Sequence, residues 1–157
     1  MQMVRSTLAL AVLGLLLQAC GGSSGGGSSR FTGTWHPISG TVTTSCPGFA
    51  PDTSSVTDNI TWSNGVSNDL VQTDPSTSCV LNADITGSTA SGSGPACTIP
   101  DGNGGNLTIT ITAYTFALAA DGQTAQENGS GTAVDNVGGA SVTCTISETA
   151  SYQKIGN

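Results

Sequence analysis

Basic side chains are almost missing from this sequence. Three lysines and arginines stand against ten acidic residues in 157, which gives a formal net charge of -7 at pH 7. A protein that binds nucleic acid needs a basic surface to neutralise phosphates and release their counterions. Nucleic acid is therefore excluded as a partner. The acidic residues are spread along the chain, so they form no polyanionic tail.

Histidine and aromatic residues are also scarce. His36 is the one histidine, and aromatic residues make up 4% of the chain. A catalytic histidine is normally oriented by a carboxylate and paired with a nucleophile. Ser93 and Ser130 lie in Gly-Ser-Gly segments without the strand-to-helix pattern of a hydrolase nucleophile elbow. The sequence predicts no catalytic residues, and we expect the protein not to be an enzyme.

Helical periodicity is absent after Arg30. No stretch there places apolar residues at helical spacing over three turns, so we expect no helices. Apolar and polar residues alternate instead in short segments separated by turn residues, as Leu107, Ile109 and Ile111 do with threonines. About eight such segments predict an all-β fold, a small antiparallel barrel, with a two-sheet β-sandwich as the alternative.

Two local signals refine this prediction. The apolar positions change phase at Tyr114, which predicts a bulge near Ala113. Asp121-Gly122 is typical of a β-hairpin turn. We therefore expect the segments on either side of these two residues to pair.

A short apolar run opens the chain. It extends from Leu8 to Leu17 after the positive charge of Arg5. About ten apolar residues are too few for the roughly 20 that cross a bilayer as a helix, and the arrangement is typical of a secretory signal peptide. We expect residues 1–19 to be cleaved.

The end of this segment carries a lipidation signal. Leu17-Gln18-Ala19-Cys20 resembles the lipobox of bacterial lipoproteins. The resemblance implies cleavage before Cys20, a diacylglycerol on its sulfur and acylation, as by palmitate, of the new N-terminus. Acyl chains add about 0.8 kcal/mol per buried methylene and anchor the protein to a membrane. The alternative is an ordinary secretory signal followed by a chance cysteine.

The residues after Cys20 predict where the protein resides. Residues 21–29 are only Gly and Ser, a composition that behaves as a flexible coil. We therefore assign residues 20–29 to a lipidated tether and residues 30–157 to one disulfide-bonded β domain. In bacterial lipoproteins an Asp after the lipidated Cys favours inner-membrane retention. With Gly21 in that place, the resemblance implies lipid anchoring at the outer membrane of a bacterial cell envelope.

One aromatic motif stands at the start of the domain. Phe31-Thr32-Gly33-Thr34-Trp35 resembles the Gly-x-Trp start of the first strand in lipocalin-like and avidin-like barrels. The resemblance implies that Trp35 plugs the closed end of a barrel. We find neither the later tryptophans of an avidin ligand site nor the basic residue that often covers this Trp in lipocalins. We therefore assign Trp35 to the core.

The other aromatic residues are candidates for the core or for the wall of a ligand cavity. They are Trp62, Tyr114, Phe116 and Tyr152. Ligand cavities are largely apolar with few polar groups. Because a domain with so few aromatic residues needs most of them inside, we expect all four in the core.

The segment from Asp101 to Asn106 has oxygen-bearing side chains at alternate positions, as calcium loops do. Thr112 stands where an EF-hand loop places its bidentate Glu. Asp, Asn and Gly are also the residues that turns require. We therefore expect a plain loop, no metal and no cofactor.

Four cysteines remain for disulfides in an exported domain, namely Cys46, Cys79, Cys97 and Cys144. Of the three pairings, a hairpin centred near Ser88 favours Cys79 with Cys97, because it places them opposite each other. The remaining pair, Cys46 with Cys144, joins the first strand to the last.

The second pair predicts a register between those strands. With Cys46 opposite Cys144, Val42 faces Glu148 and Ile38 faces Tyr152, so inward positions of the two strands coincide. The disulfide then fastens the closure of the barrel.

Three functions are compatible with these features. The first is a binding module that holds a small apolar ligand in the barrel or a protein or glycan partner on its loops. The second is a structural cell-surface component without a discrete ligand, and the third and weakest is a hydrolase. A cavity of a few hundred Å³ is typical of the first, whereas an interior filled by Trp35 and Phe116 favours the second.

The lipobox predicts the effect of one substitution. Cys20→Ser removes the only atom that can carry the thioether-linked lipid, so the protein should move from membrane pellets to the soluble fraction. Immunoblotting of the two fractions measures this. Retention of the variant in the pellet, with normal processing of its precursor, would show that the chain is not a lipoprotein.

Overall fold

The computed structural model describes residues 27–157 except 75–76, 101–104 and 138–139. The predicted signal peptide, the lipidation site at Cys20, residues 20–26 of the tether and most of the candidate calcium loop lie outside the described residues. The described chain begins beside helix α1 (Ser28–Phe31). This helix includes Ser28 and Ser29, which the sequence assigns to the tether.

The rest of the described chain is almost entirely β-strand, which confirms the predicted all-β class. The strands are β1 (Gly33–Ser45), β2 (Asp52–Ser55), β3 (Ile60–Asn64), β4 (Leu70–Thr73), β5 (Val80–Thr86), β6 (Thr89–Ser93), β7 (Cys97–Pro100), β8 (Asn106–Leu118), β9 (Thr124–Val137) and β10 (Ala140–Gly156). Helix α1 is the exception to the expectation of no helices. It is one turn long, with Thr32 N–H donating to Ser28 O, and it buries Phe31.

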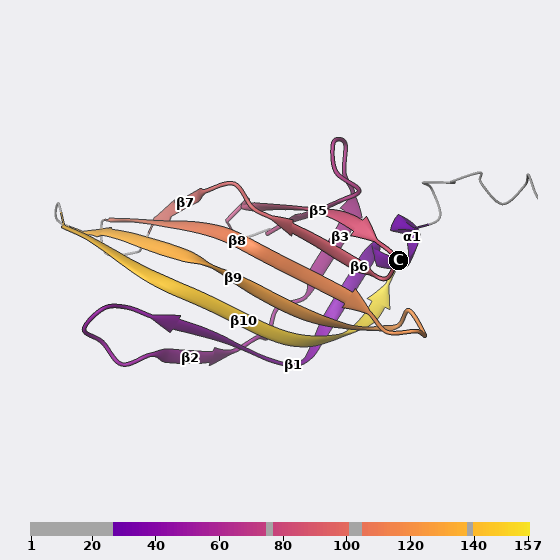
Figure 1. Ribbon diagram of the computed structural model, residues 1–157, viewed down its shortest axis with the longest axis horizontal. Coiled ribbons are helices and arrows are strands. Elements are labelled where there is room, and N and C mark those ends of the chain that lie inside the picture. The colour runs from indigo at the N-terminus through magenta and orange to yellow at the C-terminus, as the bar shows by residue number, and fades with distance from the viewer. Residues whose placement is uncertain (1–26, 75–76, 101–104, 138–139) are drawn as a thin grey trace, which may run out of the picture.

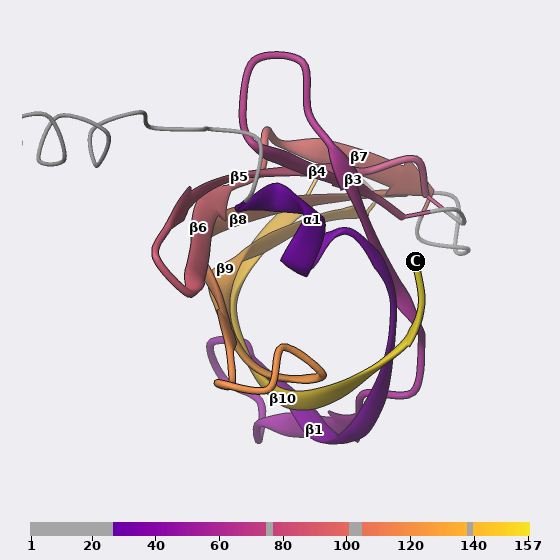
Figure 2. The ribbon, with the colours of Figure 1, turned by 90° about the vertical axis from the view of Figure 1, so that its right-hand side faces the viewer.

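Eight strands form a closed antiparallel barrel in the order β1-β3-β4-β5-β6-β8-β9-β10, and β10 pairs again with β1. This confirms the predicted barrel, and the alternative of a β-sandwich is wrong. Figure 2 looks at the end where α1 lies and shows the strands around a ring. Strands β2 and β7 are additional and pair with β1 and β8.

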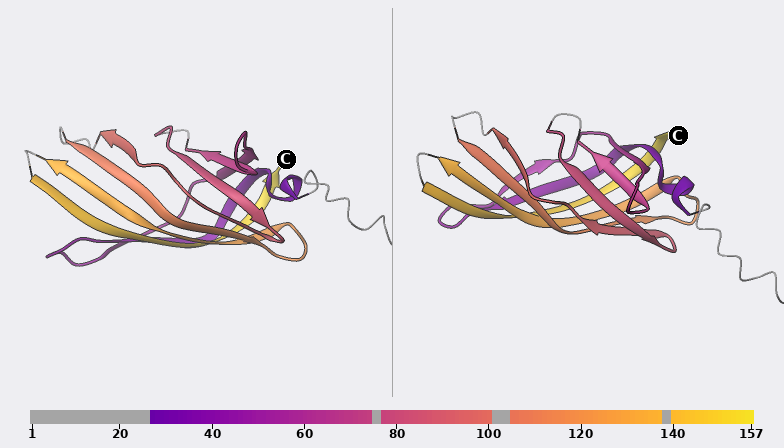
Figure 3. Two further views of the ribbon diagram at one scale, coloured as in Figure 1. Left: turned by 45° about the horizontal axis from the view of Figure 1, so that its top comes forward. Right: turned by 90° about the horizontal axis from the view of Figure 1, so that it is seen from above.

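The barrel is much longer on one side than on the other. Strands β1, β8, β9 and β10 have 13, 13, 14 and 17 residues, whereas β3 to β6 have four to seven. The long strands extend beyond the short ones at the end away from α1, where β2 and β7 flank them (Figures 1 and 3). One end is therefore a complete ring, and the other opens into a curved sheet.

The complete ring holds the aromatic core. Trp35 is fully buried, its ring centroid lies 5.1 Å from that of Phe116, and its Nε1 donates to Phe31 O at 2.8 Å. Lys154 Nζ lies 5.6 Å from the centroid of the Trp35 ring and donates to Arg30 O at 3.3 Å. The expectation that no basic residue covers Trp35 is therefore wrong, since the last strand supplies one.

Bulges set the register of the long strands. Val42 lies opposite Glu148, as predicted, but a register shift between Pro37 and Ser39 places Pro37 opposite Tyr152. Ile38 occupies the bulge and is 59% exposed, so its predicted inward position opposite Tyr152 is wrong.

The other two local predictions of register are correct. A shift between Ile111 and Ala113 in the pairing of β8 with β9 confirms the bulge expected near Ala113. The turn at Asp121 joins the same two strands, and its Oδ1 accepts hydrogen bonds from the N–H groups of Gln123 and Thr124. Asp121 thereby caps a turn in which Gly122 takes a φ of 66°.

Both predicted disulfides, Cys46–Cys144 and Cys79–Cys97, are present. The expectation that a hairpin centred near Ser88 places Cys79 opposite Cys97 is partly wrong. The β5–β6 hairpin turns at Gly87 and Ser88 but ends at Ser93, and Cys97 lies on β7, opposite Ile109 of β8. This disulfide therefore ties the start of β5 to an added strand, not to its hairpin partner.

None of the helices in the described part of the chain has the length and apolar character needed to cross a membrane.

The two disulfides should differ in their contribution to stability. They close loops with sequence separations of 98 and 18 residues. In the chain-entropy model the longer loop restricts the unfolded chain more, by about 1–2 kcal/mol. Urea unfolding of two double-alanine variants should show the larger loss for Cys46→Ala with Cys144→Ala. An equal or smaller loss than for the Cys79 and Cys97 pair would contradict this.

Candidate ligand-binding site

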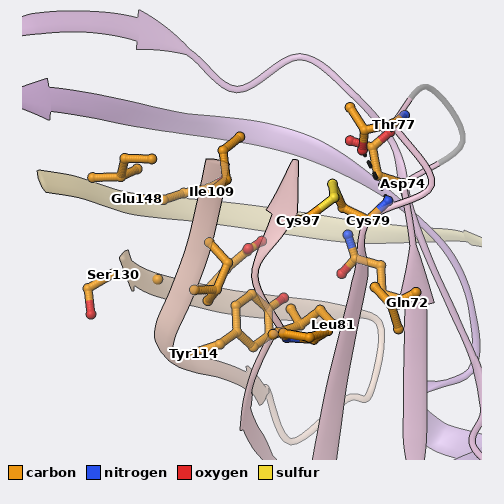
Figure 4. A pocket seen from close by; sticks show the side chains of 17 residues that line it. Gln72, Asp74, Thr77, Cys79, Leu81, Cys97, Ile109, Tyr114, Ser130 and Glu148 are labelled. Atoms are coloured by element: carbon orange, nitrogen blue, oxygen red, sulfur yellow. Dashed lines mark hydrogen bonds between the residues drawn. A yellow bond between two sulfur atoms is a disulfide. The ribbon is translucent and has the colours of Figure 1, made fainter. Parts of the chain in front are cut away.

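A cavity of about 320 Å³ lies beside the aromatic core, on the side away from α1. Side chains of β4 and β5 face those of β8, β9 and β10 across it, and the Cys79–Cys97 disulfide lies in its wall. Figure 4 shows the ring of Tyr114 from β8 pointing toward Leu81 of β5, on the side of the cavity where Gln72 of β4 lies. The exposed residues Pro95 and Ser130 mark where the cavity meets solvent.

In the wall of the cavity, β9 contributes a glycine where its neighbours contribute large side chains. Gly129 lies opposite Tyr114 on one side and Glu148 on the other. A Cβ added at Gly129 would lie 3.7 Å from Glu148 Cβ and 3.8 Å from Tyr114 Cδ2, which are ordinary contacts. The space next to Gly129 is therefore open to a larger side chain. Gly131 differs, because an added Cβ there would clash with Thr110 O.

Two glutamates on neighbouring strands face this cavity. Glu127 of β9 is opposite Ala150, and Glu148 of β10 is opposite Gly129, so the two are diagonal neighbours across the sheet. Backbone positions related in this way are about 7–8 Å apart. Glu127 is only 6% exposed, which is exceptional for a carboxylic acid.

Three buried polar atoms at the cavity lack a hydrogen-bond partner. They are Glu127 Oε2, Tyr114 Oη and Gln72 Oε1. A buried donor or acceptor left in this state costs about 1–3 kcal/mol. These three atoms are available for hydrogen bonds with another molecule in the cavity.

Burial sets the ionisation of these groups. Removal from water raises the pKa of Glu127 to about 7, and the negative charge of Glu148 adds to this rise. The hydroxyls of Tyr152 and Tyr114 act in the opposite direction on that pKa. They lie near the carboxyl, although Tyr114 Oη completes no hydrogen bond of good geometry. Burial likewise raises the pKa of Glu148 and those of both tyrosines.

No cation offsets these carboxyls among the described residues that line the cavity. Arg30 and Lys154 are the basic side chains of the described chain, and both lie at the closed end around Trp35. His36 is exposed on the barrel surface, where its Nδ1 lies 2.8 Å from Asn59 Oδ1. The cavity is therefore acidic, and the histidine is not part of it.

The residues singled out in the sequence are divided between core and cavity. Trp62 and Phe116 are buried in the core, as expected, whereas Tyr114 also lines the cavity. Tyr152 is buried near Glu127. Ser130 reaches the cavity, but Ser93 does not line it.

Glu127 was not among the residues predicted from the sequence to form a site. It occupies an inward position between Ala125 and Gly129 in the alternation of β9. An acidic residue at an inward position of a strand is the signal that would have identified it.

The described residues contain no group of three or more His, Cys, Asp or Glu side chains placed to hold a metal ion. No protein-family model and no curated protein matches the sequence.

The pH dependence of stability tests the state of Glu127. The folded protein keeps Glu127 protonated up to a pKa of about 7, whereas an unperturbed Glu ionises near 4.5. The free energy of unfolding should therefore fall as the pH rises through this window. In Glu127→Gln this decrease in the free energy of unfolding should be smaller by a few kcal/mol, since one pKa unit corresponds to about 1.4 kcal/mol. Urea unfolding at about pH 5 and about pH 8 measures the difference.

Asp52→Asn, at an exposed carboxyl on β2, is the matched control, in which the fall that comes from Glu127 should persist. Equal pH dependence in wild type and Glu127→Gln would show that Glu127 titrates as an ordinary surface carboxyl.

Proposed function

We propose that this chain is a lipid-anchored protein of the bacterial envelope whose barrel binds a small, mainly apolar molecule. One observation carries the proposal. A cavity of about 320 Å³ with mainly apolar walls contains buried polar atoms that have no partner. This combination is typical of small-ligand sites, in which a few polar groups orient an otherwise apolar molecule.

The same observation disfavours a purely structural role. A barrel that only provides a stable surface has no need for an interior space, and filling one improves packing. The closed end is filled in this way by Trp35 and Phe116. The cavity lies directly beyond this packed layer, with leucine and isoleucine side chains in its walls.

Binding is also better supported than catalysis. A hydrolase that works through histidine needs that side chain beside a nucleophile and a carboxylate. His36 lies outside the cavity and contacts an asparagine. We therefore propose no reaction for this site.

The position of α1 supports a particular orientation at the membrane. The described chain begins at Gly27, beside α1 and the closed end of the barrel (Figure 1). A tether from a lipidated Cys20 would join the domain at this end. The cavity lies on the far side of the aromatic core, so in the proposed arrangement it faces away from the membrane. A ligand then reaches it without passing between the domain and the lipid.

A cavity-filling substitution tests the proposed function. Gly129→Leu should place a side chain in the cavity with only ordinary contacts at its Cβ. Native mass spectrometry of the full chain in its Cys20→Ser form should detect a bound small molecule, and Gly129→Leu should reduce its occupancy about tenfold or more.

Asn128→Leu is the matched control, because it adds the same side chain one residue earlier, at an exposed position. It should retain the bound molecule. Equal occupancy in wild type and Gly129→Leu would contradict binding in this cavity.

A further inference from the structure

The unpartnered atoms of the cavity specify what a ligand must offer. Gln72 Oε1 is an amide oxygen and can only accept a hydrogen bond. Glu127 Oε2 likewise only accepts when the carboxyl is ionised, and Tyr114 Oη can accept as well as donate. A ligand that satisfies them must therefore donate several hydrogen bonds from one end. An ammonium group has three donors and no acceptor.

The charge of the cavity also favours a ligand that donates hydrogen bonds. Glu127 and Glu148 both face the space, and the described lining residues include no cation. An anionic ligand would meet like charge at a desolvated site. A cationic ligand would gain charge-assisted hydrogen bonds, which are about twice as strong as neutral ones.

The remaining walls define the rest of the ligand. Leu81, Ile109, Ile111 and Ile146 surround the space with aliphatic side chains, and the Cys79–Cys97 disulfide adds a further apolar surface. These walls favour a compact hydrocarbon body, either short aliphatic or a single ring, adjacent to the polar end.

We propose that the cavity binds a small primary amine with an apolar body, and that its ammonium group lies between Glu127, Glu148 and Tyr114. The inference rests on the proposed function and specifies its ligand class. Glu127 provides the main ionic contact because it is the more deeply buried carboxyl. Gln72 Oε1 accepts a further hydrogen bond from the same group.

Binding of an amine should be coupled to release of a proton. Glu127 is surrounded by Glu148 and Tyr152 of β10 and by Tyr114 of β8, and its pKa in the free protein is about 7. An ammonium group pairs with the ionised carboxylate, so below pH 7 Glu127 must lose a proton on binding. An alkyl amine, with a pKa of about 10, stays charged across this range. The affinity for the amine should therefore rise with pH up to about 7, by at most about tenfold per pH unit.

Three probes of similar shape separate the contribution of charge to affinity from that of steric fit. They are 2-phenylethylamine, 2-phenylethanol and 3-phenylpropanoate, which share a phenyl ring and differ in the polar end. NMR titration of the full chain in its Cys20→Ser form, at about pH 6 and about pH 8, gives the affinity for each. At pH 8 the amine should bind about tenfold to a hundredfold more tightly than the alcohol, as expected for a hydrogen bond to a charged group. The carboxylate should bind most weakly.

Glu127→Gln should reduce the preference for the amine over the alcohol to about threefold or less and abolish its pH dependence, while the alcohol still binds. Asp52→Asn removes an exposed carboxyl that does not line the cavity and should preserve the preference. Gly129→Leu should weaken the alcohol and the amine together.

The outcomes distinguish this inference from the proposed function. Alcohol and amine that bind equally, or a carboxylate that binds best, overturn the assignment of an amine but support ligand binding in the cavity. An amine preference that persists in Glu127→Gln also overturns it. If no probe binds and Gly129→Leu carries the same bound molecule as wild type, both the inference and the proposed function are wrong.

Discussion

Pairing between the first and the last strand is the interaction on which the rest of this domain depends. Strand β1 runs antiparallel to β10 from Thr34, opposite Gly156, to Ser45, opposite Thr145, and the Cys46–Cys144 disulfide continues the ladder by one residue. Without this pairing the sheet would have two long exposed edges, which invite association with other chains. With it, Trp35 of β1 and Tyr152 of β10 contribute to one core and the inward faces enclose a space.

The interior is divided between a packed end and a hollow one. The fully buried large side chains gather around Phe116, whose ring lies 5.1 to 6.1 Å from those of Trp35, Trp62 and Tyr152. Each such side chain contributes about 1.5–3 kcal/mol by burial. This packed layer offsets the cost of the unpartnered polar atoms in the cavity beyond it. Gly129 of β9 places no side chain between Tyr114 and Glu148 there.

The sequence predicts this fold where periodicity alone decides it. Antiparallel pairing fixes every residue once one pair is known, so the Cys46–Cys144 pair also gave the opposition of Val42 and Glu148. A bulge shifts the register by one residue, which is why the predicted position of Ile38 opposite Tyr152 was wrong. Strand β4 has four residues, too few for alternation to be recognised. The alternation of β9 gives Glu127 an inward position, but its neighbours Tyr114 and Glu148 come from β8 and β10, which the sequence of β9 does not reveal.

The position of the Cys46–Cys144 disulfide has a mechanical consequence. Tension on the residues before α1 acts first on the Gly33 end of β1, where the strand can peel from β3 and β10 one hydrogen bond at a time. Extraction of Trp35 from the core is the initial resistance, since the ring is fully buried. The peeling front then stops at the covalent link. Extension is limited to the 13 residues of β1, about 40 Å at roughly 3.3 Å per residue. The disulfide also keeps β1 next to β10 under tension, so the strand can pair again when the tension ends.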